Sequence, residues 1–99
     1  MVRPPSGKVV RAGHQIGEQL TTWRKLLGLT AAQVADRAGI ARSTLARVEK
    51  GEGGVNFQAV LSMARALGVL DDLVRATDPY ESDLGRARAD QQLPKRVRS

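Results

Sequence analysis

The sequence lacks cysteine altogether, which excludes a disulfide framework and every zinc site built on thiolates. Aromatic side chains make up only 3% of the 99 residues, so alanine, leucine and valine must supply one modest hydrophobic core. The sequence contains no apolar run near the roughly 18 to 20 residues that span a bilayer, and no apolar signal-peptide region. We therefore expect one soluble domain in the cytoplasm, a reducing compartment.

Groups that could carry catalysis or bind a metal are equally scarce. His14 is the only histidine, and the carboxylates lie mostly at helix-capping or tail positions, so no nucleophile and base can be paired. The glycine-rich segment 51–54 lacks the preceding strand and the Lys-Ser/Thr pair of a phosphate-binding loop. The sequence thus predicts a protein that is not an enzyme and has no cofactor and no metal.

The charge balance points to an acidic partner. Lys and Arg number 16 against 10 Asp and Glu, for a formal net charge of +6. Nucleic acid, an anionic membrane and an acidic protein surface would all suit this charge. A membrane is the poorest of the three, because the basic residues do not lie opposite one continuous apolar helix face. We expect no membrane partner.

Apolar periodicity and capping residues predict an all-α fold with five helices. The first runs from His14 to Leu27, and its apolar stripe should lie in the core: Ile16, Leu20, Trp23 and Leu27. Four more follow at about 31–38, 42–50, 57–67 and 70–76, the fourth with a buried face of Val60, Leu61, Ala64 and Leu67. Residues 1–13, rich in proline, glycine and basic side chains, should form a flexible arm, and residues 78–99 a weakly structured tail.

The ends of the central helices carry clear local signals. Thr30 and Gln33 are spaced as a capping box at the start of the second helix, and Gly39 ends it. Ala35 and Gly39 are small enough to let the third helix approach closely. Asn56 suits the N-cap of the fourth helix, whereas Ala41 at the start of the third offers no capping oxygen.

A set of short motifs lies around the second and third predicted helices: Arg24, Gly28-Leu29-Thr30, Val34-Ala35, Ala38-Gly39, Ile40, Ser43-Thr44 and Glu49-Lys50-Gly51. With these features, the segment from about Leu27 to Gly53 resembles the lambda-repressor-like, or XRE, helix-turn-helix family. The resemblance covers about residues 16–75, and it implies a compact DNA-binding domain over residues 14–77. Two positions depart from the family pattern: Ala31 stands where a glutamine commonly meets a phosphate, and Ala41 where Ser or Thr usually caps the recognition helix.

The third helix would then read DNA bases with its outer face. If Ile40, Leu45 and Val48 face the core, Arg42, Ser43 and Arg47 lie opposite. Arginine can donate two hydrogen bonds to guanine O6 and N7 in the major groove, so Arg42, Arg47 and Ser43 are the candidate base-reading residues. On an arbitrary helix these arginines would simply be solubilising charges.

Other roles follow from the resemblance. Family geometry implies phosphate contacts for Thr30, Gln33, Thr44 and Lys50. It also implies a structural ion pair between Arg24 and Glu49 that ties the first helix to the end of the third. The DNA partner would be a palindromic operator in double-stranded DNA, bound by a homodimer, because one short helix reads too few base pairs alone.

The tail carries a second resemblance. Asp83, Gly85 and Arg86, followed by Leu93, Pro94, Arg96, Val97 and Arg98, resemble the tails of HipB-like antitoxins encoded beside HipA-family kinases. This implies a repressor of its own operon that binds a HipA-like serine/threonine kinase toxin, with Arg86, Arg88, Arg96 and Arg98 as partner-binding candidates. Two alternatives stay open: a basic extension that adds phosphate affinity, and a transcriptional regulator that works without a toxin.

Overall fold

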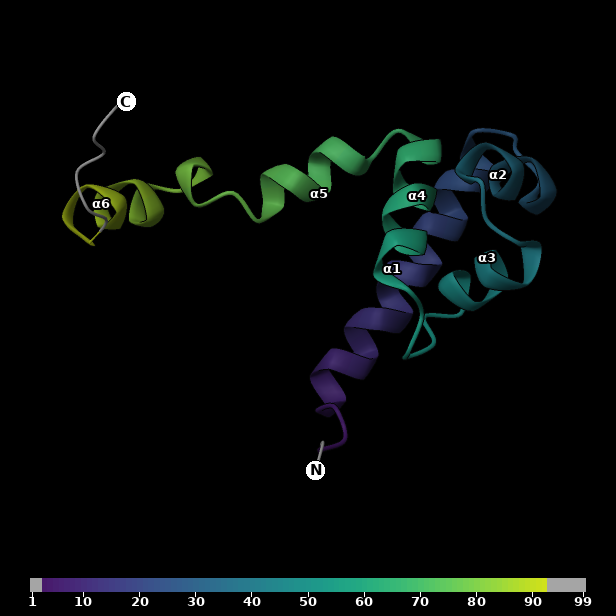
Figure 1. Ribbon diagram of the computed structural model, residues 1–99, viewed down its shortest axis with the longest axis horizontal. Coiled ribbons are helices and arrows are strands. Elements are labelled where there is room, and N and C mark those ends of the chain that lie inside the picture. The colour runs from purple at the N-terminus through teal and green to yellow at the C-terminus, as the bar shows by residue number, and fades with distance from the viewer. Residues whose placement is uncertain (1–2, 93–99) are drawn as a thin grey trace.

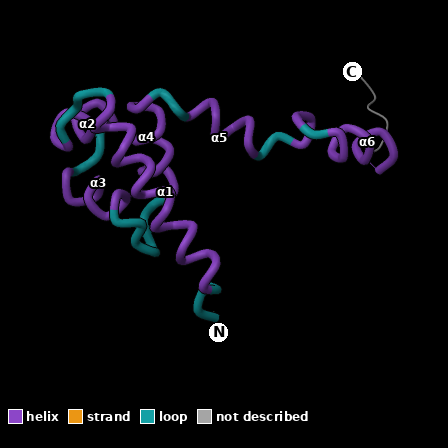
Figure 2. The backbone as a smooth tube through the Cα atoms, turned by 180° about the vertical axis from the view of Figure 1, so that it is seen from behind, coloured by secondary structure: helices purple, strands orange, loops and turns teal. Residues whose placement is uncertain are grey.

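The computed structural model describes residues 3–92, which form six α-helices, one short 3₁₀ helix and no strand (Figure 1). In chain order they are α1 (Gly7–Leu26), α2 (Ala31–Ala38), α3 (Arg42–Glu49), α4 (Phe57–Leu67), α5 (Leu70–Ala76), η1 (Pro79–Glu81) and α6 (Asp83–Gln92). Helices α1 to α4 pack into a body, from which the first half of α1 and the segment α5–η1–α6 project in different directions (Figures 1 and 2). The all-α, lambda-repressor-like fold expected from the sequence is confirmed.

Local capping sets the ends of α2 and α4 where the sequence predicts them. The Thr30 hydroxyl accepts a hydrogen bond from the Gln33 amide, and the Gln33 side chain accepts one from the Thr30 amide, which completes the capping box. Asn56 accepts from two amides at the start of α4. Gly39 ends α2 with a φ of 70°, a left-handed conformation that glycine adopts without strain.

The prediction of a flexible arm over residues 1–13 is wrong from Gly7 onward. The Ser6 hydroxyl accepts a hydrogen bond from the Val9 amide, at 3.2 Å, and so caps a helix of 20 residues. This N-terminal half of α1 has almost no buried side chains, and composition alone therefore suggested disorder. Its helical form follows from the serine cap and from continuity with the packed second half.

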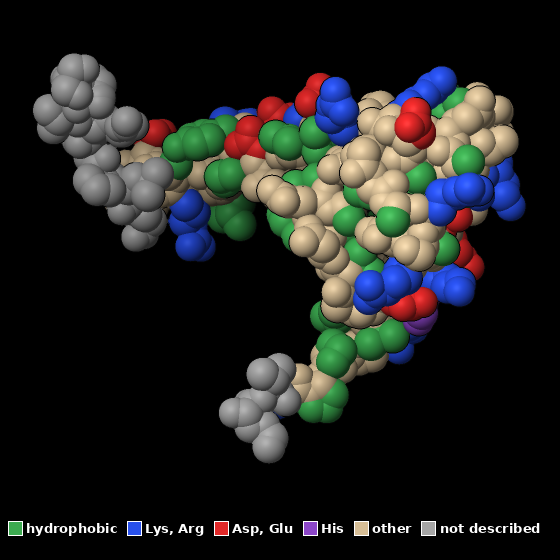
Figure 3. Space-filling view, turned by 45° about the vertical axis from the view of Figure 1, so that its right-hand side comes forward, with side chains coloured by type: hydrophobic (Ala, Val, Ile, Leu, Met, Phe, Trp, Pro, Cys, Tyr) green, Lys and Arg blue, Asp and Glu red, His purple; other side chains and the backbone are tan. Residues whose placement is uncertain are grey.

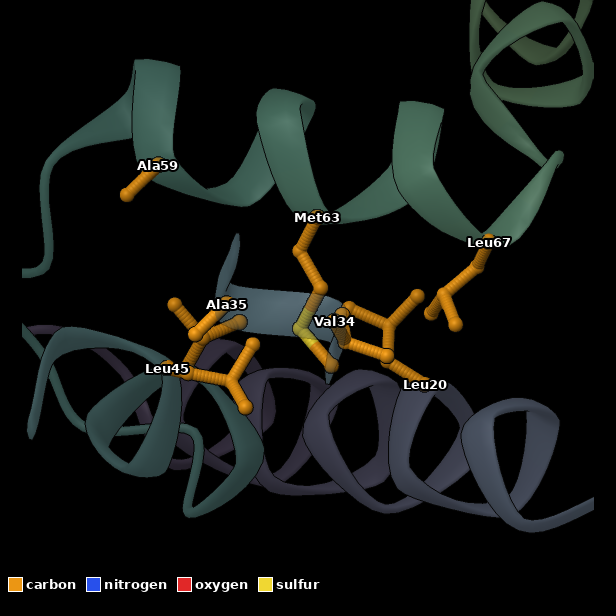
Figure 4. Close-up of a cluster of buried hydrophobic side chains, with 8 residues drawn as sticks. Leu20, Val34, Ala35, Leu45, Ala59, Met63 and Leu67 are labelled. Carbon is orange, nitrogen blue, oxygen red and sulfur yellow. The ribbon is translucent and has the colours of Figure 1, made fainter. Parts of the chain in front are cut away.

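The core gathers eight buried side chains from the four helices of the body. Met63 of α4 is fully buried and points into the middle of the cluster, with Leu20 of α1 and Val34 of α2 on one side and Leu45 of α3 on the other (Figure 4). The full set is Leu20, Val34, Ala35, Leu45, Val48, Ala59, Met63 and Leu67. Unbranched methionine fills the irregular space where three helices meet.

Helix α1 is turned relative to the predicted stripe. Only Leu20 of that stripe is buried, whereas Ile16, Trp23 and Leu27 are 46%, 45% and 48% exposed. The face of α1 that meets the body carries Gly17, Leu20 and Arg24, three residues of which only one is large and apolar. Counting large apolar residues alone therefore placed the inward face about one residue out of register.

The buried face of α4 differs in the same way. Ala64 and Leu67 are buried as expected, but Ala59 and Met63 complete the face, while Val60 and Leu61 are only half-buried. The sequence could not distinguish these residues, because eight of the eleven α4 residues are apolar and they lie on almost every side of the helix. Packing against α2 decides the face.

The segment beyond the body is helical, which corrects the expectation of a weakly structured tail as far as residue 92. Ser82 and Asp78 cap its turns, and Arg86 donates to the Tyr80 carbonyl and pairs with Asp83. The segment projects from the body, and the radius of gyration is 17.0 Å against about 13 Å for a compact chain of 100 residues. None of the described helices is long and apolar enough to cross a membrane.

Candidate nucleic-acid interface

Helices α2 and α3 form a rigid pair joined by a tight turn. The Ile40 amide donates to the Ala35 carbonyl, at 3.0 Å, directly after the left-handed Gly39. Leu45 and Val48 then anchor α3 in the core, at 0% and 4% exposure. The opposite side of α3 consequently faces solvent.

That exposed side brings together the predicted base-reading residues. Arg42, Ser43 and Arg47 are all exposed, as is Lys50 just beyond the end of the helix. Thr44 is half-buried, at the border between this face and the core. Figure 3 shows several Lys and Arg side chains over the part of the body that contains α2 and α3. The arrangement offers guanidinium donors on a convex helix surface.

Arg47 has a partner that the sequence did not suggest. Its Nε lies 3.2 Å from Oε1 of Glu52, and both side chains are nearly half exposed. An exposed pair of this kind contributes about 1 kcal/mol at most. Because only Nε is used, the two terminal nitrogens of Arg47 stay available as a donor fork. Spacing gave no signal for the pair, since Glu52 lies outside the helix, in the loop.

The predicted phosphate-contacting residues Thr30 and Gln33 already have a structural role. Their oxygens accept the capping-box hydrogen bonds at 3.0 and 2.8 Å. The Thr30 hydroxyl proton and the Gln33 amide group remain exposed donors at the N-terminus of α2. Capping therefore orients both donors outward at the positive end of a helix.

The Arg24 and Glu49 side chains form an ion pair between α1 and α3. Arg24 Nε lies 2.7 Å from Glu49 Oε2, and the side chains are only 14% and 16% exposed. A second Arg24 nitrogen donates to the Leu29 carbonyl, at 3.1 Å. The arginine thus connects the end of α1, the turn before α2 and the end of α3.

Three glycines that sequence reasoning missed bring α1 against the end of α3. A Cβ on Gly17 would lie 2.6 Å from the Glu49 carbonyl oxygen and 2.7 Å from that of Val48. A Cβ on Gly51 would collide with the Gly13 backbone, and His14 Nδ1 lies 2.9 Å from the Lys50 carbonyl oxygen. The spacing of Gly13 and Gly17, one helical turn apart, is the signal that could have revealed this contact.

Two expectations near this contact need correction. Nothing lies within 4 Å of a Cβ built on Gly39, so Gly39 provides a backbone conformation rather than the close approach predicted for it. His14 lies inside α1 and not at a helix start. Among the described residues, no group of three side chains is arranged to hold a metal ion.

The predicted tail residues lie far from α3 in the projecting segment. Arg86 pairs with Asp83, and a Cβ on Gly85 would collide with the Pro79 carbonyl, so these residues hold α6 against η1. Arg88 is exposed. Arg96 and Arg98, with the rest of the motif from Leu93 onward, lie outside the described residues.

Comparison with known proteins agrees with this geometry. A family model described as a helix-turn-helix domain matches residues 15–77. The chain is also 34% identical, over 82 residues, to the cryptic phage CTXphi transcriptional repressor RstR of Vibrio cholerae serotype O1 (strain ATCC 39315 / El Tor Inaba N16961). That alignment covers 80% of this chain and 73% of the repressor.

Proposed function

The chain belongs to the XRE, lambda-repressor-like helix-turn-helix family of DNA-binding transcriptional regulators, and from this premise we propose that it represses transcription as a homodimer on a palindromic operator. The observation that carries the proposal is the exposed face of α3, held outward by the fully buried Leu45. The similarity to a Vibrio transcriptional repressor supports repression rather than activation. Such a protein works where the operator lies, in the cytoplasm.

In this proposal Arg42, Ser43 and Arg47 enter the major groove and contact base edges. The groove is about 12 Å wide, enough for one helix whose outer face is polar. The terminal nitrogens of Arg47 form the fork that matches guanine O6 and N7, while Glu52 limits the directions in which that fork points. Arg42 has no ion-pair partner among the described residues and is free to take the same role.

Phosphates on either side of the groove would hold the helix in register. Thr30 and Gln33 offer their outward donors at the positive N-terminus of α2. Thr44 and Lys50 would contact the backbone that flanks α3. Contacts of this kind position the protein on any sequence and do not discriminate between base pairs.

A homodimer follows from the size of the reading element. Helix α3 has only eight residues, so one copy spans too few base pairs to select a site. Two copies related by a two-fold axis read two half-sites, about 34 Å apart from centre to centre. The operator is then an inverted repeat.

The test compares two variants in binding to the operator and to random DNA. Because the homodimer carries each residue twice, Arg47→Ala should lose roughly 30- to 20,000-fold in affinity for the operator and little for random sequence. Lys50→Ala should weaken both alike and lower the slope of log affinity against log salt by about two, one for each copy. If Arg47→Ala lowered specific and random binding equally, Arg47 would be a phosphate contact and the base-reading assignment would fail.

We propose further that this repressor is the antitoxin of a HipBA-type system, which represses its own operon and binds a HipA-like kinase. The support is the tail motif that begins at Asp83 and continues beyond the described residues. Against it stands the local role of Asp83, Gly85 and Arg86 in holding α6 to η1, which accounts for these residues without a partner. The alternative is a regulator of the same family that works alone.

Removing residues 84–99, which leaves Tyr80 and Glu81 in place, separates the antitoxin hypothesis from that of a regulator that works alone. A kinase-like protein encoded beside this gene should co-purify with the full chain and not with the shortened one, while both bind the operator. If the shortened chain lost only DNA affinity, or if the kinase bound both chains equally, the tail would not be the antitoxin element.

A further inference from the structure

An apolar groove lies between α1, α4 and α5, on a face that includes no α3 residue. It encloses about 440 Å³. Its walls include large apolar side chains that are far from buried, with Ile16 at 46%, Trp23 at 45%, Phe57 at 73% and Leu73 at 37% exposure. Monomeric proteins rarely expose so many large apolar side chains together.

The aromatic residues mark this face most clearly. The chain contains one Trp, one Phe and one Tyr. Trp23 and Phe57 line the groove, and Tyr80, 52% exposed, lies in the segment that continues from its α5 wall. None of the three aromatic side chains is buried in the core. Because aromatic side chains dominate the energetics of protein interfaces, their position marks this face as a candidate interface.

Both walls of the groove extend into projecting helices that carry more exposed apolar residues. Helix α1 leads to Val9 and Val10, and α5 leads to Val74, Tyr80 and Leu84. The two projections diverge from the body, leaving a concave angle between them (Figure 1). The segment α5–η1–α6 extends away from the body with α6 at its far end, so this segment does not fold back into the angle (Figure 2).

The two projections are also opposite in charge. Residues 3–15 carry three basic side chains and no acidic one, whereas residues 71–83 carry five acidic side chains and one basic one. Asp72 and Asp83 already pair with Arg75 and Arg86, which leaves Asp71, Asp78 and Glu81 without an ion-pair partner among the described residues. Within one chain they point apart and cannot meet. In a dimer with a two-fold axis, the basic half of α1 in one copy would meet the acidic α5–η1 segment of the other, and the same contact would occur twice.

We propose that a second copy of this chain occupies the groove, with each copy placing the basic N-terminal half of its α1 against the acidic α5–η1 segment of the other. This inference rests on the proposed function, because it gives the surface of the homodimer that a palindromic operator requires. The docking buries Trp23, Phe57 and Tyr80 from both copies. It leaves both α3 faces free, because no residue of α3 lines the groove.

The first test measures the oligomeric state by sedimentation velocity. The full chain should be a dimer, and Phe57→Glu and Tyr80→Glu should each weaken dimerisation by about tenfold or more, because a charge would be buried against aromatic rings. Leu26→Glu is the matched control, since Leu26 is 73% exposed and lies outside the groove. Circular dichroism checks that all three variants stay helical. A monomeric wild type, or a dimer unaffected by both groove variants, would overturn the proposal.

The second test uses charge exchange to examine the reciprocal pairing. Arg11→Glu and Glu81→Lys should each weaken the homodimer, because each opposes like charges twice. An equal mixture of the two variants should recover dimers, since both contacts of the mixed dimer join opposite charges. If the mixture dimerised no better than either variant alone, the proposed pairing of α1 with the α5–η1 segment of the second copy would be wrong.

Operator binding in the same samples separates this inference from the proposed function. If Phe57→Glu weakens the dimer but no operator is bound, the proposed interface is supported and the proposed repressor function is overturned. If the dimer binds an operator and no groove variant weakens it, the repressor function is supported and the interface is overturned. A third outcome is that the wild-type chain is a monomer that co-purifies with a kinase, and that Phe57→Glu abolishes this co-purification. This would assign the groove to the kinase and overturn the proposal of a second copy.

Discussion

At the scale of single residues, the position of α3 depends on glycines, because their lack of a side chain allows backbone to touch backbone. Gly17 and Gly51 let the backbone of α1 touch the end of α3, and Gly13 completes the contact. Arg24 and Glu49 then tie the same two helices together with an ion pair that is largely shielded from water. The orientation of the exposed face of α3 therefore depends on residues that lie on the other side of the helix or outside it.

We expect Gly17→Ala to lower the free energy of unfolding by about 2 kcal/mol or more. Its Cβ would lie within 3 Å of three backbone atoms, and backbone can relieve such a contact only by moving α3 away from α1. Urea denaturation followed by circular dichroism measures the change. Gly53→Ala is the control, because its Cβ would meet nothing within 4 Å. Equal stability of the two variants would show that the α1–α3 contact is looser than described.

At the scale of elements, the sequence predicted what local chemistry decides. The bounds of α2 and α4 follow from caps and glycines that interact within a few residues, and both helices form where these signals predicted them. Helix α5 also forms at the predicted residues, although Val69 at its N-cap offers no side-chain hydrogen bond. The outward face of α3 was predictable because Leu45 and Val48 are the only large apolar residues within the helix.

The elements that were mispredicted are those that depend on distant contacts. Helix α1 faces the body with Gly17 and Arg24, and neither residue counts as apolar in a periodicity analysis. Trp23 was assigned to the core by the same count, yet it lines an open groove. The Arg47–Glu52 pair depends on the path of the loop after α3, and residue spacing along a helix does not predict that path.

Helix α3 starts without a side-chain cap, and this gives a prediction for the element. Ala41 has the extended backbone of an N-cap residue, with φ −68° and ψ 150°, but no oxygen to accept from the helix amides. Ala41→Ser should therefore raise the free energy of unfolding by about 1 kcal/mol. Thermal unfolding of this variant, compared with Ala41→Val, which fits the site but cannot cap, measures the effect. A serine variant no more stable than the valine variant would mean that α3 needs no cap.

At the scale of the whole molecule, the net charge of +6 is unevenly distributed. Residues 16–74 carry seven basic and six acidic side chains, so the body is nearly neutral, and residues 1–15 carry three basic side chains and no acidic one. Under the proposed function, sequence recognition then comes from the placement of Arg42 and Arg47 on α3 rather than from bulk attraction. Basic segments outside the body would add phosphate affinity that falls steeply with salt.

The most direct test of the central claim is selection of bound duplexes from a pool of random DNA sequences at physiological salt. The account predicts that the recovered duplexes share an inverted repeat whose half-sites are centred about one helical turn, ~34 Å, apart. It also predicts that the purified chain binds this repeat at least about 10³-fold more tightly than random DNA. Recovered duplexes with no common sequence, or a common sequence without two-fold symmetry, would contradict the account of a dimer that reads DNA through α3.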